Sequence, residues 1–123
     1  MKFTLESTGD ANLIRGWEAG ALRINDDTVA GDVVVSADTL LRVTLGSAES
    51  LDEAALEPAL ALRPEVLLVG TGARQRFLAP ALMQALARRG VGVEVMDTLA
   101  AARTYNVLVG EGRRVVAALI APS

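Results

Sequence analysis

The residues with the clearest chemical potential lie in two short segments. The first is Gly70-Thr71-Gly72, which follows an unbroken apolar run. A glycine turn between a strand and a crossover helix directs backbone N–H groups at an anion. Glycine also tolerates positive φ, so a tight-turn role stays open beside a phosphate or carboxylate site. The dinucleotide-binding fingerprint is incomplete, because Gln75 replaces its third glycine.

The second segment begins at Asp97 and ends at Asn106. It contains Arg103, whose planar guanidinium can donate two parallel hydrogen bonds to a carboxylate or a phosphate. We therefore predict a site for a small anionic ligand formed by Gly70, Thr71, Gly72 and Arg103. The side chains predicted to line the adjoining cleft are Asp97, Thr98, Thr104, Tyr105 and Asn106.

A structural role for the second segment is the alternative. Asp97 would then cap a helix, and Asn106 would satisfy buried backbone groups. Arg103 would form an ion pair with Glu111 or Glu94. The sequence leaves both interpretations open and identifies no catalytic residue.

Composition excludes several kinds of chemistry. The chain has no cysteine and no histidine, so it lacks disulfides, thiol nucleophiles, the usual zinc and iron–sulfur ligands and the commonest general base. The adjacent acidic pairs, Asp26-Asp27 and Asp52-Glu53, fall in an expected turn and at an expected helix start. We predict no metal site and no cofactor, and whether the chain is an enzyme stays open.

Charge and hydropathy narrow the partners and the location. A net charge of −3 and an aromatic content of 3% do not favour nucleic-acid binding. The amino terminus turns acidic at Glu6, unlike a targeting peptide. The longest apolar run, residues 115–121, is far below the roughly 20 residues of a membrane span. We expect a cytoplasmic protein without membrane insertion, with a protein partner or a small anionic ligand.

A βαβ unit should position the two candidate segments. The run 66–69 predicts a buried strand, Pro80 is suited to the first position of a helix, and 91–96 predicts a second buried strand. The sequence Arg88-Arg89-Gly90 has the cations and the glycine typical of a helix end. The loops after two parallel strands leave the same sheet edge, so Thr71, Gly72 and Asp97 should be neighbours.

The remaining elements complete one predicted domain over residues 1–123. Short strands over 13–18, 21–24, 28–29, 32–35 and 40–45 form an antiparallel meander. A capping box with Ser50 as N-cap predicts a helix over 54–62. A third helix runs to about Val109, and a final strand over 114–120 should pair antiparallel because the loop before it is short. Trp17 and Phe3 are assigned to the core.

Longer runs of the sequence resemble a family of small domains of unknown function. The resemblance rests on GVEVMDT at 92–98, RTYNVL at 103–108, EGR at 111–113 and VGTG at 69–72. The family includes bacterial and archaeal proteins, mitochondrial complex I assembly factor 3 and an adipogenesis-associated domain protein. This chain departs from the pattern at Leu99 and Ala102, where glycine and cysteine are common.

The resemblance implies a fold and a broad function. The fold is α/β with three layers: a central mixed sheet of about five strands with one strand antiparallel to the rest, containing the βαβ unit, and a small amino-terminal antiparallel β layer. The function implied is a non-enzymatic binding or assembly module. The alternative is an enzyme or sensor that binds a small anionic metabolite at Gly70-Thr71-Gly72.

Overall fold

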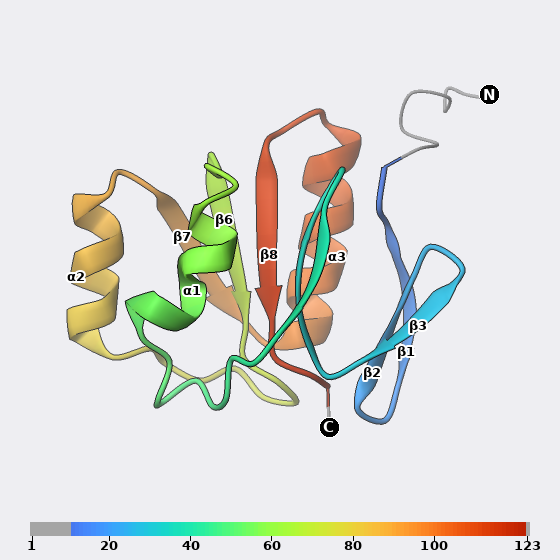
Figure 1. The fold of residues 1–123 in the computed structure, drawn as a ribbon, viewed down its shortest axis with the longest axis horizontal. Helices are drawn as coiled ribbons and strands as arrows, with labels where there is room; N and C mark the ends of the chain where they lie inside the picture. The colour runs from blue at the N-terminus through green and yellow to red at the C-terminus, as the bar shows by residue number, and fades with distance from the viewer. Residues whose placement is uncertain (1–10, 123) are drawn as a thin grey trace.

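The computed structural model describes residues 11–122 of the chain, so Phe3 lies outside the described residues. Eight strands and three helices follow one another along this part (Figure 1). Their order is β1 (Ile14–Glu18), β2 (Ala21–Ile24), β3 (Asp27–Ala30), β4 (Asp32–Ser36), β5 (Leu40–Val43), α1 (Glu53–Leu60), β6 (Val66–Gly70), α2 (Pro80–Arg88), β7 (Gly92–Met96), α3 (Thr98–Gly110) and β8 (Val115–Leu119).

The central sheet has five strands in the order β5-β4-β8-β6-β7. β6 pairs parallel with both β7 and β8, whereas β4 pairs antiparallel with both β8 and β5. β4 is therefore the one strand that runs against the other four, as the resemblance implied. β1, β2 and β3 form a separate antiparallel sheet, which confirms the small amino-terminal β layer.

Two crossovers build the parallel part of the sheet. The unit β6-α2-β7 confirms the predicted βαβ unit. The second crossover is β7-α3-β8. The final strand pairs antiparallel with β4, as predicted, but it also pairs parallel with β6, which the prediction did not include. The length of the preceding loop did not indicate this parallel pairing. The 13 residues of α3 span about 20 Å, enough to carry the chain back along a five-residue strand of about 17 Å.

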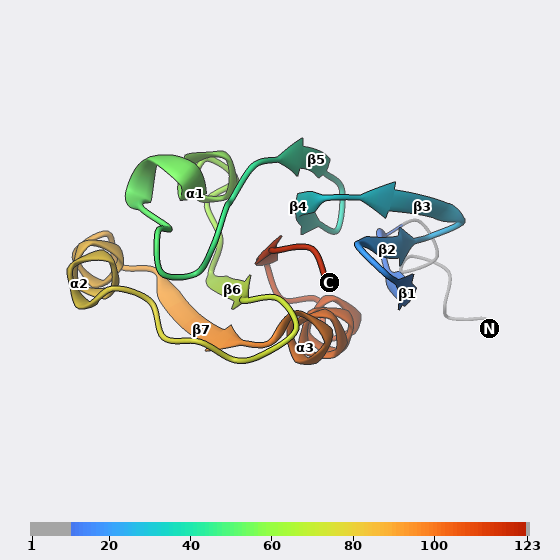
Figure 2. The ribbon, with the colours of Figure 1, turned by 90° about the horizontal axis from the view of Figure 1, so that it is seen from below.

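Each face of the central sheet buries its own apolar cluster. α1 and α2 cover one face through Leu56, Leu60, Leu82 and Leu86. α3 and the three-stranded sheet cover the other, where Tyr105 packs among aliphatic side chains. Figure 2 shows α3 on the opposite side of the central sheet from α1. All five residues of β8 are buried, as expected for a central strand covered on both faces.

The helix ends follow local chemistry, with one correction. Asp52, not Ser50, is the N-cap of α1 and accepts a hydrogen bond from the N–H of Ala55 at 2.9 Å. Ser50 instead bonds with the hydroxyl of Ser47 at 2.9 Å. The predicted helix over 54–62 is Glu53–Leu60, with Pro58 inside it. Pro80 opens α2 as predicted, and Gly90 follows its end with φ +75°.

The aromatic residues correct a second prediction. Tyr105 is fully buried, but 59% of Trp17 is exposed, so its assignment to the core is wrong. A β-bulge between Ile14 and Gly16 shifts which side chains of β1 share a face. Trp17 faces Leu22 across the small sheet and Ile14 faces Ile24, so the bulge places Trp17 on the buried side of the strand. Trp17 is nevertheless exposed, because it lies next to the last residue of β1, where the rest of the protein covers less than half of the side chain.

Candidate functional site

The turn after β6 meets the start of α3, as the predicted topology requires. The N–H of Thr71 donates to the carbonyl of Met96 at 2.9 Å. The N–H of Gly72 donates to Thr98 Oγ1 at 2.8 Å, and the N–H of Thr98 donates to the carbonyl of Gly72 at 2.9 Å. The two candidate segments are thus directly hydrogen-bonded to each other.

Thr98 joins this junction to the end of β8. Its side chain is fully buried, and its hydroxyl donates to the carbonyl of Ile120 at 2.7 Å while it accepts from Gly72. Gly70 makes the close approach feasible. A Cβ atom there would lie 2.8 Å from Leu119 Cδ2 and 2.9 Å from Thr98 Cα and Oγ1. Gly72 adopts φ +96°, a conformation that favours glycine.

Thr71 organises the loop that follows. Its hydroxyl donates to the carbonyl of Arg74 at 2.6 Å and accepts from the N–H of Arg76 at 3.1 Å. The N–H groups of Thr71 and Gly72 therefore both have acceptors within the protein. An anion at this turn would have to displace these hydrogen bonds, and the anion site stays a prediction.

Two further polar residues, Asp97 and Thr104, form hydrogen bonds with the backbone of α3 itself. Asp97 is the N-cap and accepts from the N–H of Ala100 at 2.8 Å. Thr104 donates to the carbonyl of Ala100 at 2.9 Å, one turn earlier. Both side chains thus act within one turn of their own positions.

Tyr105 and Asn106 attach α3 to the amino-terminal part of the described chain. The Tyr105 hydroxyl donates to the carbonyl of Asn12 at 2.8 Å, and burial, with a smaller effect of Asp38, raises the pKa of Tyr105 above its usual range. Asn106 accepts from the N–H of Ile14 at 2.9 Å and donates to the Ile14 carbonyl at 2.7 Å. The amide thus holds β1 at its bulge.

Arg103 lies away from these hydrogen bonds. It is exposed and pairs with neither Glu94 nor Glu111, nor with any other carboxylate of residues 11–122. Instead it lines a cavity of about 160 Å³ between β1 and α3, together with Trp17. The sequence missed this cavity because the bulge that places Trp17 there leaves no recognisable pattern.

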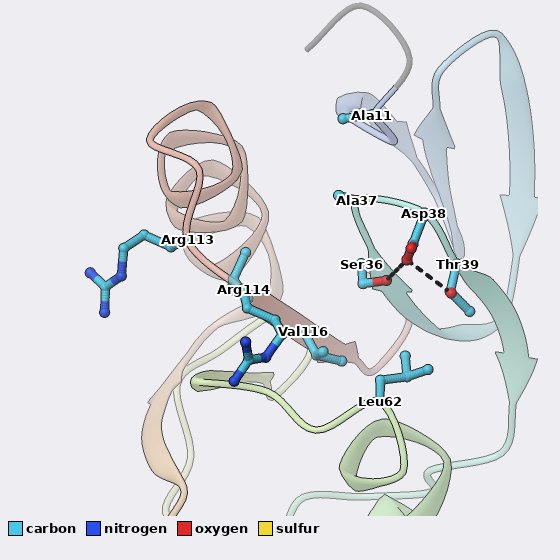
Figure 3. A pocket seen from close by; sticks show the side chains of 10 residues that line it. Ala11, Ser36, Ala37, Asp38, Thr39, Leu62, Arg113, Arg114 and Val116 are labelled. Atoms are coloured by element: carbon cyan, nitrogen blue, oxygen red, sulfur yellow. Dashed lines mark hydrogen bonds between the residues drawn. The ribbon is translucent and has the colours of Figure 1, made fainter. Parts of the chain in front are cut away.

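A larger cavity of about 520 Å³ lies at the other end of the sheet, where β4 ends and β8 begins (Figure 3). On one wall, the hydroxyls of Ser36 and Thr39 donate to Asp38 Oδ1 at 3.1 and 3.2 Å. On the other, Arg114 Nε donates to the carbonyl of Arg63 at 2.7 Å. The cavity thus has opposite charges on facing walls, which suits water or a small polar molecule.

Arg113, beside this cavity, is already paired. Its Nη2 lies 3.2 Å from Glu65 Oε2, and the hydrogen bond and charge of Arg113 lower the pKa of Glu65. In Figure 3 its side chain points away from Asp38. The sequence did not show that Arg113 and Arg114 lie beside this cavity, since only the pairing of β4 with β8 brings the start of β8 next to the end of β4.

Among residues 11–122, no three or more acidic side chains gather in a way that could hold a metal ion. Within the same residues, none of the helices combines the length and the hydropathy that crossing a membrane would need.

The junction of Gly70–Gly72 with Thr98 falls inside a match to a known family. A model described as a protein of unknown function, DUF498/DUF598, matches residues 14–120. The chain belongs to this family. It is 41% identical over 101 residues to NADH dehydrogenase [ubiquinone] 1 alpha subcomplex assembly factor 3 of Xenopus tropicalis, which covers 80% of this chain. The match spans only 55% of that longer relative.

Solved structures share the fold. A crystal structure of a Bordetella parapertussis protein superposes with a TM-score of 0.84 at 39% identity, covering 90% of this chain and 96% of that one. A solution structure of a Bordetella pertussis protein, described as an Mth938-like domain, has a TM-score of 0.82 at 32% identity and covers 98% of this chain and 92% of that one. The three-layer α/β fold is therefore that of Mth938-like domains.

Proposed function

We propose that this chain is a non-enzymatic binding or assembly module that acts on a protein partner. The observation that carries the proposal is the internal use of the polar groups that could do chemistry. Five of these side chains form their hydrogen bonds with the protein's own backbone: Thr71, Asp97, Thr98, Tyr105 and Asn106. Groups committed in this way hold a fold together and are poorly placed to turn over a substrate.

The names of relatives support the same function. The Xenopus tropicalis relative is named as an assembly factor for NADH dehydrogenase, and assembly is a task of protein recognition. This chain spans only about half of that relative. That it has a protein partner of its own is therefore part of the proposal. A cytoplasmic location and a single domain over residues 1–123 also stay predictions and belong to the proposal.

Purification of the tagged chain from its native host tests the function. We expect a stoichiometric protein partner to remain bound at several salt concentrations, with the tag alone as the control. Deletion of the gene should then change the amount or the assembly state of the partner's complex in native gels. A chain that is recovered alone under all conditions would contradict the proposal.

The alternative, a site for a small anionic metabolite at Gly70-Thr71-Gly72, makes a different prediction. It requires thermal stabilisation by a nucleotide or an organic acid, and loss of that stabilisation in Arg103→Ala. The internal acceptors of the Thr71 and Gly72 N–H groups count against it. Stabilisation by such an anion in the parent chain, absent in Arg103→Ala, would favour it over the assembly module.

A further inference from the structure

The cavity between β1 and α3 has the size and lining of a socket for one apolar side chain. Its volume is about 160 Å³, and a comparable apolar cavity of about 150 Å³ accommodates a benzene ring. The apolar residues that line it come from both elements and from the neighbouring strand β2. They are Ile14, Leu22, Leu99 and Ala102.

Trp17 and two arginines stand around this socket. Trp17, 59% exposed, lines the cavity together with Arg15 and Arg103. Tryptophan and arginine are the residue types that contribute most binding energy at protein interfaces. A partner that covers both the exposed tryptophan and the apolar cavity beside it removes more apolar surface from water than a partner that covers either one alone.

Two of the residues around this socket, Arg15 and Arg103, are positively charged. Neither Arg15 nor Arg103 forms an ion pair with any carboxylate of residues 11–122, and Glu18, the one acidic residue of β1, pairs with neither. Elsewhere in the described chain, Arg76, Arg89 and Arg113 all have glutamate partners. Other arginines of the described chain, Arg74 among them, also lack ion pairs, but Arg15 and Arg103 line one cavity together and are suited to bind external carboxylates jointly.

The two walls of the socket are fixed relative to each other. Asn106 bonds to both backbone groups of Ile14, and Tyr105 bonds to the carbonyl of Asn12. A preformed socket binds with less loss of conformational entropy than one that must be ordered by its ligand.

We propose that the face formed by Arg15, Trp17, Leu99 and Arg103 docks an acidic segment of the partner protein. One apolar side chain of that segment fills the cavity beside Trp17, and flanking carboxylates bind Arg15 and Arg103. This inference rests on the proposed function and names the chemistry of the partner. It leaves the junction at Gly72 and Thr98 as a structural element.

Trp17 provides a site-specific signal, because it is the only tryptophan in the chain. Its fluorescence is measured while one of three synthetic peptides of equal length is added: an acidic peptide with one central leucine, the same peptide with serine for leucine, and a basic peptide with the leucine. We expect only the acidic leucine peptide to shift the emission to shorter wavelength. Added salt should weaken this binding.

Charge reversal tests the role of the arginines. Arg103→Glu should weaken binding of the acidic leucine peptide about tenfold or more and improve binding of the basic one, since attraction becomes repulsion. Arg74→Glu is the matched control, because Arg74 is also exposed and lacks an ion pair within residues 11–122. The control should bind like the parent, and both variants should unfold at similar temperatures.

Several outcomes would overturn the inference. These are no emission change with the acidic leucine peptide, an equal change with the serine peptide or inorganic phosphate, or equal weakening by Arg74→Glu. A shift that grows with protein concentration alone would assign the face to a second copy of the chain. A partner that co-purifies equally with Arg103→Glu and Trp17→Ser would refute this inference and leave the proposed function intact.

Discussion

Because Gly70 has no side chain, β6 can lie close to β8 and to the start of α3. A Cβ at this position would lie within 3 Å of Leu119 and Thr98, so Gly70→Ala should force them apart. We expect it to lower the free energy of unfolding by about 1–3 kcal/mol, the usual cost of overpacking. Urea denaturation measures the change.

Gly110→Ala is the control for this prediction. Gly110 is the last residue of α3, and a Cβ there would meet no atom within 4 Å. Alanine should therefore leave stability unchanged or raise it slightly, by at most about 1 kcal/mol. Equal destabilisation by both substitutions would mean that the close approach at Gly70 does not matter.

Tyr105 should make the fold sensitive to alkaline pH. Burial raises the pKa of its hydroxyl in the folded state, whereas the unfolded chain ionises near the ordinary value of about 10. The unfolded state then binds fewer protons above about pH 10, so stability is complete below that pH and falls above it, by up to about 1.4 kcal/mol per pH unit.

Two measurements check the pH dependence. Tyr105 is the only tyrosine, so phenolate absorbance reports its ionisation alone, and this should coincide with unfolding. In urea denaturation, Tyr105→Phe should lose the fall in stability above about pH 10, although it costs some stability at neutral pH through the lost bond to Asn12. Ionisation of Tyr105 in the native state near its ordinary pKa would show that the hydroxyl is not held as described.

At the residue scale, an interaction could be predicted from the sequence only when its two partners lie close together in the chain. The role of Asp97 as a helix cap could be predicted from the sequence, because its partner Ala100 is only three residues away. The N-cap of α1 was predicted wrongly as Ser50 instead of Asp52. Both residues lie just before the helix and can accept a hydrogen bond from its first turn, so only the backbone conformation decides between them. The bond from Asn106 to Ile14 spans 92 residues and could be anticipated only as an unspecified backbone contact.

At the scale of elements, α3 holds the small sheet through few polar contacts. Asn106→Ala removes both bonds to Ile14, leaving a partly buried N–H and carbonyl without partners. We expect amide exchange to accelerate in β1, β2 and β3, while β6 and β8 keep their protection. Hydrogen–deuterium exchange read by mass spectrometry resolves the two sheets.

Thr104→Ala is the matched control on the same helix. Its hydroxyl bonds to the carbonyl of Ala100, so its removal should not change exchange in the small sheet. If Asn106→Ala accelerates exchange equally in both sheets, the two layers unfold as one unit and the amide is no separate attachment.

Most of the strands and helices could be predicted from the sequence. The strands 66–70 and 92–96 and the start of α2 at Pro80 followed from apolar runs and turn residues. The antiparallel pairing of β8 with β4 was predicted, but its parallel pairing with β6 was not, because a loop length does not show the direction in which α3 returns the chain. The prediction that Trp17 belongs to the core failed because a residue pattern does not show how much of the protein covers a face near the end of a strand.

At the scale of the whole molecule, Asp32 ties three parts of the chain together. Its carboxylate accepts from the N–H groups of Leu45 at 2.7 Å and Gly46 at 3.3 Å, and from Ala121 at 2.8 Å. Asp32→Ala leaves these donors without an acceptor and should lower the free energy of unfolding by about 3 kcal/mol. Thermal or urea unfolding measures this loss.

Asp26→Ala is the comparison for Asp32. Asp26 is an exposed turn residue with the same charge, and we expect a change within about 0.5 kcal/mol. A similar loss in both variants would attribute the effect to net charge rather than to the three backbone bonds of Asp32.

The order of the central sheet has a consequence for biosynthesis. β8 separates the pair β5-β4 from the pair β6-β7, yet it is the last of the described strands to leave the ribosome. Until it emerges, the nascent chain holds two hairpin-sized fragments with unpaired inner edges and exposed apolar faces. Such edges are prone to aggregate, so a chaperone should bind the growing chain until residues 115–119 have left the ribosome.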